Sequence, residues 1–116
     1  MSESFTVYLR NEEKVLLMQR ADGVSDFPGA WDGIYGLGNP DDLDAVAKRV
    51  EECTGISRDK FEFVRTGEAR GLEYGNRLND VTPILCICDT NDVVPSTLYK
   101  NCEWVDPGRI KEKEYS

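Results

Sequence analysis

The feature that most constrains this chain is one segment, residues 41–54, with the pattern of a helix that is apolar on one side only. Asn39 is placed to cap this helix, Pro40 suits its first turn, and Gly55 would stop it. The apolar residues recur at three- and four-residue spacing, and the charged residues between them would face outward: Leu43, Val46, Ala47, Val50 and Cys53 against Asp44, Lys48 and Glu52. A helix with one apolar side buries it against another layer, so we expect this helix to pack on a sheet.

The segments around the helix carry strand patterns. Two apolar runs, residues 5–9 and 15–18, flank a polar tract, as in a β-hairpin. A turn-rich stretch over residues 21–31 leads into a short strand near 33–37. Three further strands are predicted, at residues 61–66, 81–88 and 102–105. This order predicts an α+β domain in which the helix lies on one face of a mixed sheet.

The second half of the chain adds three expectations. Both alternating faces of Val81–Cys88 are apolar, so this strand is expected to be central and covered on both sides. Residues 67–79 are rich in Gly, Glu and Arg and predict a loop or ragged strand ends. Pro107 is expected to open a short C-terminal helical turn that runs through Lys113.

Length and charge narrow the class of protein. A chain of 116 residues is expected to form a single domain, residues 1–116. Its 22 acidic and 14 basic residues give a net charge of -8, which argues against binding to nucleic-acid phosphates or to an anionic membrane surface. The N-terminal residues do not resemble a signal peptide, and no apolar segment approaches the roughly 18 residues of a membrane span. We therefore expect a cytoplasmic protein.

Cysteine and histidine usage gives no indication of a metal centre. Cys53, Cys86, Cys88 and Cys102 lack the C-x2-C spacing of a zinc site, and we expect buried free thiols. The chain has no histidine, so the commonest general base and the commonest transition-metal ligand are both absent. Any chemistry must rest on carboxylates, Lys, Tyr or Cys.

The order of elements, together with four short segments, resembles the Nudix hydrolases across nearly the whole chain. Val15–Arg20 is similar to the second strand of that family, and Pro28–Asp32 is similar to its tryptophan turn. Gly36–Gly38 resembles its glycine corner, and Glu103–Pro107 resembles the segment before its closing helix. The resemblance implies a Nudix-type α/β/α sandwich.

The catalytic box of that family is degenerate in this chain. The family pattern is G-x5-E-x7-R-E-U-x-E-E-x-G-U, where U is aliphatic, and Thr54-Gly55-Ile56 fixes its end. Glu52 matches the first acid of the E-E pair, whereas the second acid is Cys53 and the R-E pair is Lys48-Arg49. The stretch between the glycine corner and Lys48 is shorter than the pattern requires, and the Glu of that stretch is missing.

These changes remove most of the carboxylates that would bind a metal. Three acids on one helix edge would hold magnesium against a pyrophosphate, but this edge presents Glu52 beside the cation of Arg49. Glu52 remains a candidate ligand for magnesium or manganese, and Glu51 is a second candidate that the helical angle places off the edge. We expect no tight magnesium site.

The resemblance also implies where a substrate would lie. In some members of the family, a general base comes from the loop before the central strand, where Glu68 and Glu73 fall, so these two and Glu52 are the candidate catalytic residues. The candidate ligand-binding residues are cations for a phosphate, aromatic side chains for a nucleobase and the glycine corner: Arg20, Arg49, Arg70, Trp31, Tyr35, Tyr74, Gly36 and Gly38. The alternative for each charged side chain is an ordinary solvated surface, and for Trp31 it is packing at the core edge.

Two functions follow from this resemblance. The chain is either a non-catalytic or weakly active module that binds a nucleotide, a sugar phosphate or a protein, or an active pyrophosphohydrolase that cleaves nucleoside diphosphate derivatives. In the first hypothesis, Arg49 supplies the positive charge of the lost metal. Only nine residues follow Pro107, so one sheet face is expected to be poorly covered, which implies a homodimer or a protein partner.

Overall fold

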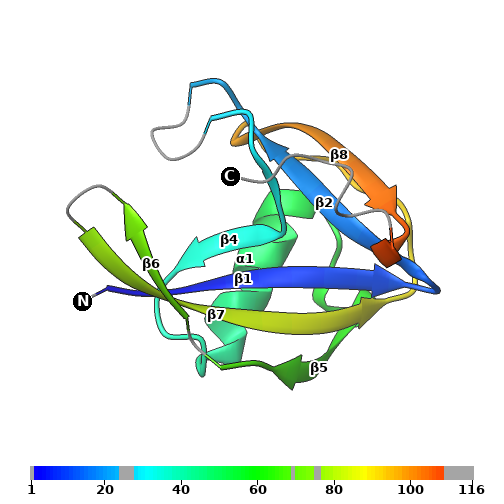
Figure 1. Cartoon of the computed structure of the whole chain (residues 1–116). Helices are drawn as coiled ribbons and strands as arrows, with labels where there is room; N and C mark the ends of the chain where they lie inside the picture. The colour runs from blue at the N-terminus through cyan, green and yellow to red at the C-terminus, as the bar shows by residue number, and fades with distance from the viewer. Residues whose placement is uncertain (1, 24–27, 69, 75–76, 109–116) are drawn as a thin grey trace.

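The computed structural model describes residues 2–23, 28–68, 70–74 and 77–108, apart from the side chains of residue 2 and residues 70–80. Figure 1 shows a sheet with one α-helix packed behind it. The described elements are β1 (Ser2–Asn11), β2 (Lys14–Arg20), β3 (Trp31–Asp32), β4 (Ile34–Leu37), α1 (Leu43–Thr54), the 3-10 turn η1 (Arg58–Lys60), β5 (Phe61–Thr66), β6 (Arg70–Tyr74), β7 (Arg77–Cys88) and β8 (Tyr99–Val105).

The eight described strands form one mixed sheet. Its main path runs β3-β2-β1-β7-β5, while β4 pairs with β1, β6 with β7, and β8 with β2. β1 and β7 are parallel and in register from Ser2 opposite Asn79 to Arg10 opposite Ile87. The other pairs are antiparallel. Because β7 lies between β1 and β5, the central position predicted for residues 81–88 is confirmed.

The helix starts and stops on local hydrogen bonds. Asp42, rather than Asn39, caps α1, because its Oδ1 accepts a hydrogen bond from the Ala45 N–H at 3.2 Å. The Asn39 side chain instead accepts from the Asp41 N–H at 2.9 Å and closes the turn before the helix. At the other end, Gly55 has a φ of 72° and donates its N–H to the Glu51 carbonyl, so the predicted glycine stop is confirmed.

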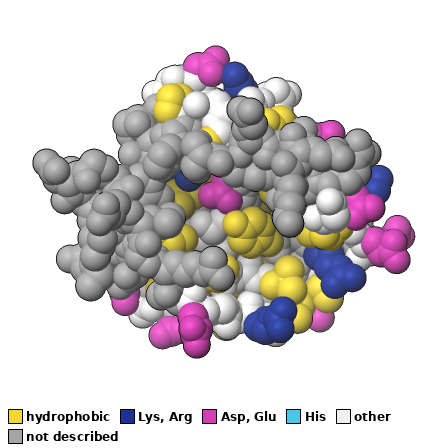
Figure 2. All heavy atoms as spheres, in the orientation of Figure 1, with side chains coloured by type: hydrophobic (Ala, Val, Ile, Leu, Met, Phe, Trp, Pro, Cys, Tyr) yellow, Lys and Arg dark blue, Asp and Glu magenta, His cyan; other side chains and the backbone are white. Residues whose placement is uncertain are grey.

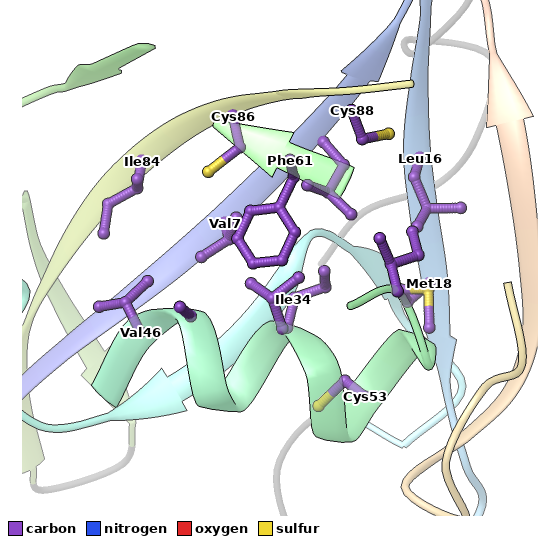
Figure 3. Close-up of a cluster of buried hydrophobic side chains, with 14 of the residues drawn as sticks. Val7, Leu16, Met18, Ile34, Val46, Cys53, Phe61, Ile84, Cys86 and Cys88 are labelled. Carbon is purple, nitrogen blue, oxygen red and sulfur yellow. The ribbon is translucent and has the colours of Figure 1, made fainter. Parts of the chain in front are cut away.

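The core lies between α1 and one face of the sheet. The predicted apolar stripe of the helix is buried except for Leu43, which is the first helical residue and is 43% exposed. Figure 3 shows Val46 on the side of the helix that faces sheet residues such as Val7 and Phe61, and Cys53 belongs to the same buried cluster. The outward positions predicted for Asp44, Lys48 and Glu52 are confirmed, since all three are exposed.

The opposite face of the sheet is covered unevenly. Leu17 of β2 and Val105 of β8 are 2% and 9% exposed. Along β7, however, Pro83 and Leu85 are half-buried and Ile87 is 48% exposed. The expectation that residues 81–88 are covered on both sides is therefore correct for the helix side only.

Two segments differ from the sequence-based expectations. Residues 70–74 and 77–80 form a regular β-hairpin rather than the expected loop or ragged strand ends, with pairs from Arg70 opposite Val81 to Tyr74 opposite Arg77. Backbone pairing stabilises this hairpin without needing an apolar side-chain pattern, which is why the pattern missed it. β8 begins at Tyr99 rather than Cys102, because it pairs with β2 over a longer length. The terminal helical turn expected through Lys113 falls mostly outside the described residues.

Among the described elements, no helix has the length and apolar composition of a membrane span.

Candidate functional site

The edge of α1 that carries the box positions combines three different side chains. Cys53 is fully buried, with 0% exposure, and belongs to the core cluster. Glu52 and Arg49 lie toward solvent, with side chains 54% and 30% exposed, and the Arg49 Nη1 atom lies 4.0 Å from Glu52 Oε2. That distance is too long for a hydrogen bond, so the two charges form a loose pair. The edge thus presents one exposed carboxylate and one cation.

Arg49 is held in place by the glycine corner. Its Nε donates a hydrogen bond to the Tyr35 carbonyl at 2.9 Å, which ties the helix to β4. Gly36 permits this approach, because a Cβ there would lie 2.3 Å from the Phe5 ring and 3.1 Å from the Arg49 Cγ. A guanidinium has five N–H donors, and the Nε donor is the one given to Tyr35. The terminal nitrogens of this partly exposed side chain remain suited to an oxyanion.

A second cation reaches the same place from β2. The Arg20 Cζ atom lies 5.1 Å from the centre of the Tyr35 ring, in a cation–π contact. Both arginines therefore contact Tyr35: Arg20 contacts the ring, and Arg49 contacts the backbone carbonyl. Two guanidinium groups thus converge at the glycine corner, in a chain whose net charge is -8.

Tyr99 joins this cluster although no sequence pattern indicated it. Its hydroxyl accepts a hydrogen bond from the Tyr35 N–H at 3.3 Å, across 64 residues of sequence. Burial raises the pKa of the Tyr99 phenol, and the neighbouring Cys53 raises it further, while the bond from Tyr35 and the charges of Arg49 and Arg20 oppose this. Tyr99 is therefore a neutral hydroxyl group at neutral pH.

Cys53 is also neutral at the position of the second acid of the box. Burial raises the pKa of its thiol, against a lowering by the charge of Arg49 and by a hydrogen bond with Tyr99. Because the thiolate is the metal-binding form, a raised pKa makes this residue a poor ligand at neutral pH. The charge of the cluster therefore comes from Arg20, Arg49 and Glu52.

A separate polar group links Tyr8 of β1 to Asp32, the last residue of β3. The Tyr8 hydroxyl donates a hydrogen bond to Asp32 Oδ1 at 3.0 Å, and the Gly33 N–H donates to the same oxygen at 2.8 Å. Trp31 precedes Asp32 in β3 and is half-buried, and it is not part of the main core cluster. Half burial is compatible with packing at the core edge, and the role of Trp31 as a ligand contact stays a prediction.

The remaining candidate residues do not join the cluster. Glu51 and Glu68 are exposed, Glu68 in the loop after β5. Gly38 is exposed, has a φ of 129°, and donates its N–H to the Glu3 carbonyl. The side chains of Arg70, Glu73 and Tyr74 lie outside the described residues. Within the described part of the chain, no group of three or more acidic or cysteine side chains is placed to hold a metal ion.

The thiols follow the sequence-based expectation closely. All four cysteines are free, three of them are buried, and Cys102 is half-buried. Burial raises the pKa of Cys86 to about 12, with the charge of Arg58 acting in the opposite direction. These thiols are packing residues of the core.

Comparison with known proteins identifies solved structures that share this fold. No family model and no curated protein sequence matches the chain. Among solved structures, an Ap4A hydrolase from C. elegans in a binary complex has a TM-score of 0.81 at 17% identity, over 97% of this chain and 85% of its own. The MutT protein from Methanosarcina mazei Go1 has a TM-score of 0.77 at 26% identity, and the match covers 97% of this chain and 82% of that protein. The NUDIX domain of Shewanella oneidensis NrtR, in complex with ADP ribose, has a TM-score of 0.73 at 14% identity, and the match covers 98% of this chain and 78% of that domain.

A mixed sheet with a helix that follows directly on a glycine corner is the Nudix fold, and these structures share it over nearly the whole chain. The expected fold is confirmed. The chain therefore has the fold of the Nudix hydrolases.

Proposed function

We propose that this chain is a Nudix module that binds a nucleotide or another phosphorylated ligand without a metal ion. The observation that carries the proposal is the position of Arg49. Its guanidinium is fixed on the Tyr35 carbonyl at the glycine corner, next to the one exposed acid of the box. A fixed cation there offsets phosphate charge in the way that a bound magnesium ion would.

The chemistry of the box edge favours an anion over a cation. Magnesium requires several oxygen ligands in near-octahedral array. On this edge Glu52 is the exposed carboxylate, Arg49 lies beside it, and Cys53 is buried with a raised pKa. Arg20, stacked on Tyr35, adds a second guanidinium. A pyrophosphate, with its several oxyanions, suits such a pair of cations better than a hard metal ion does.

Known relatives suggest the ligand class. The Shewanella oneidensis domain is in complex with ADP ribose, and the C. elegans enzyme is a hydrolase of Ap4A. Both molecules join adenosine to a chain of phosphates, so nucleoside diphosphate derivatives are the first probes. Trp31 and Tyr35 are the described aromatic side chains that would stack on a base, and Arg70 and Tyr74 are further candidates. A sugar phosphate is the second ligand class. The four free thiols fit a reducing compartment such as the cytoplasm.

Calorimetric titration with ADP ribose and with ADP, in EDTA and then in magnesium, tests this proposal. We expect the same affinity in both buffers and a loss of at least about tenfold in Arg49→Ala, the usual cost of one charge-assisted contact. Lys48→Ala is the matched control, because it removes a neighbouring exposed cation from the outward side of α1. Binding that requires magnesium and that Arg49→Ala leaves unchanged would overturn the proposal.

The second candidate function is hydrolysis, and one observation favours it. Glu52 keeps the position of the first acid of the pair and is 54% exposed. An active enzyme would use Glu52 with Glu68 or Glu73 and a magnesium or manganese ion to cleave a nucleoside diphosphate derivative. Incubation with Ap4A or ADP ribose and manganese, followed by chromatography, would detect products. Turnover that is lost in Glu52→Gln would establish the enzyme and contradict the metal-free binding module.

A further inference from the structure

We infer that the sheet face opposite α1 is the interface of a symmetric dimer, with a second copy of this chain packed around Ile87. This face contains a hollow of about 400 Å³ lined by Tyr8, Arg65, Gly67, Pro83, Ile84 and Leu85. On the same face as Pro83 and Leu85, Ile87 of β7 is 48% exposed, and Val64, at the irregularity of β5, is 51% exposed. Figure 2, which looks onto this face, shows hydrophobic side chains interspersed with Lys and Arg in its lower right part.

The strand register orders the charges around Ile87. Arg10 of β1 lies opposite Ile87 on one side, and Glu62 of β5 lies opposite it on the other. Both charged residues are exposed. Across the sheet, the cation Arg10, the apolar Ile87 and the anion Glu62 therefore lie in one row on three neighbouring strands. The next row, Tyr8, Leu85 and Arg65, lines the hollow.

This row is complementary to itself under a two-fold rotation. When the axis passes beside Ile87, the two copies of Ile87 meet, and Arg10 of each copy faces Glu62 of the other. Two-fold interfaces are built in this way, because residue i contacts residue j and residue j contacts residue i. Charge complementarity therefore selects a second copy as the occupant, since an unrelated acidic or basic partner would satisfy only one end of the row.

The face, rather than the strand edge, is the contact surface. β5 pairs with β7 alone among the described strands, so it is an edge strand. Its register shifts between Phe63 and Arg65, at the exposed Val64. Such irregularities prevent edge-to-edge pairing between copies. The apolar side chains on the face remain available for packing, and a specific dimer needs about 800 Å² on each copy.

Sedimentation equilibrium of the full chain at about 0.15 M salt, where long-range repulsion is screened, is the first test. We expect a monomer–dimer equilibrium with a dissociation constant in the micromolar range, on the order of that of a weak interface. Ile87→Asp should weaken the dimer at least about thirtyfold, because each substitution counts twice in a two-fold interface. Val94→Asp is the control, since Val94 is 74% exposed and lies in the segment after β7, beside Gly55.

A charge exchange tests the proposed row even if Ile87→Asp lowers the stability of β7. Arg10→Glu and Glu62→Arg should each weaken self-association, because like charges then face each other. An equimolar mixture of the two variants should form a heterodimer, since each altered charge then meets its opposite. Circular dichroism confirms that both variants are folded.

Three results would overturn the inference. The wild-type chain could remain a monomer at concentrations of about 200 µM, well above a micromolar dissociation constant. A dimer could form that Ile87→Asp does not weaken relative to Val94→Asp. The two charge variants could fail to associate with each other while the wild-type chain dimerises. A monomer whose Ile87 is covered by residues 109–116 of the same chain is the first of these outcomes.

Discussion

The two faces of the sheet differ in how completely they are covered, and a single strand shows the contrast. Ile84 and Ile87 both belong to β7 and are three residues apart, so they point to opposite faces. Ile84 packs toward α1 and is 1% exposed, whereas Ile87 on the other face is 48% exposed. On the helix side, α1 covers the apolar side chains of the sheet. The other side keeps a hollow, half-buried apolar residues and the pair Tyr8–Asp32. We therefore assign folding stability to the first face and propose self-association for the second.

The largest effect is expected from truncating the closed face. Ile84→Ala should lower the free energy of unfolding by about 2–5 kcal/mol, because it leaves a cavity in a core that cannot collapse fully. Ile87→Ala removes the same atoms from a half-exposed site and should cost about 1 kcal/mol or less. Urea denaturation at low protein concentration measures both variants. Equal costs would mean that the open face is as closely packed as the helix side.

The second effect is a loss of stability at alkaline pH that depends on the buried thiols. Burial raises the pKa of Cys86 from 9.0 to about 12, so the unfolded chain loses this proton first as the pH rises. Stability is therefore complete below pH 9 and falls between pH 9 and 12, by at most about 4 kcal/mol from this thiol.

Cys86→Ala should flatten that decline, whereas Cys102→Ala, at a half-buried site, should change its slope less. Denaturation curves recorded from pH 8 to about pH 11 give the slopes. Identical slopes in the two variants would show that the buried face does not hold its thiols in the neutral form.

A third and smaller effect comes from the glycine corner. Gly36→Ala would place a Cβ 2.3 Å from the Phe5 ring, which forces the core to shift and should cost about 1–3 kcal/mol. It would also press on the Arg49 stem and weaken ligand binding. Gly23→Ala meets no atom within 4 Å and should change the free energy of unfolding by about 0.5 kcal/mol or less. Thermal denaturation compares the two, and a neutral Gly36→Ala would contradict the tight contact.

The sequence predicted the elements whose signals are local. The helix stripe of Val46, Val50 and Cys53, the glycine stop at Gly55 and strand Phe61–Thr66 each follow from residues near in sequence. The sequence favours Asn39 as the helix cap, whereas the structure has Asp42 there. Two residues with equal capping ability compete, and the turn before the helix decides between them. The hairpin of β6 and β7 was missed because its ladder does not depend on apolar alternation.

The candidate site was less predictable than the fold, because several of its contacts join residues far apart in the sequence. Arg49, Glu52 and Cys53 could be found from the box alone, since they share one helix edge. Tyr99 could not, because its bond to Tyr35 spans 64 residues and no spacing links them. The stacking of Arg20 on Tyr35 likewise depends on how β2 and β4 meet, which residue types do not determine.

Calorimetric titration with manganese tests the central claim, that the cation of Arg49 stands where the family would hold a metal ion. The wild-type chain should show no binding of sub-millimolar affinity, and Arg49→Glu, which places a second carboxylate one helical turn before Glu52, should gain measurable affinity. Wild-type binding of sub-millimolar affinity that Glu52→Gln abolishes would contradict the account.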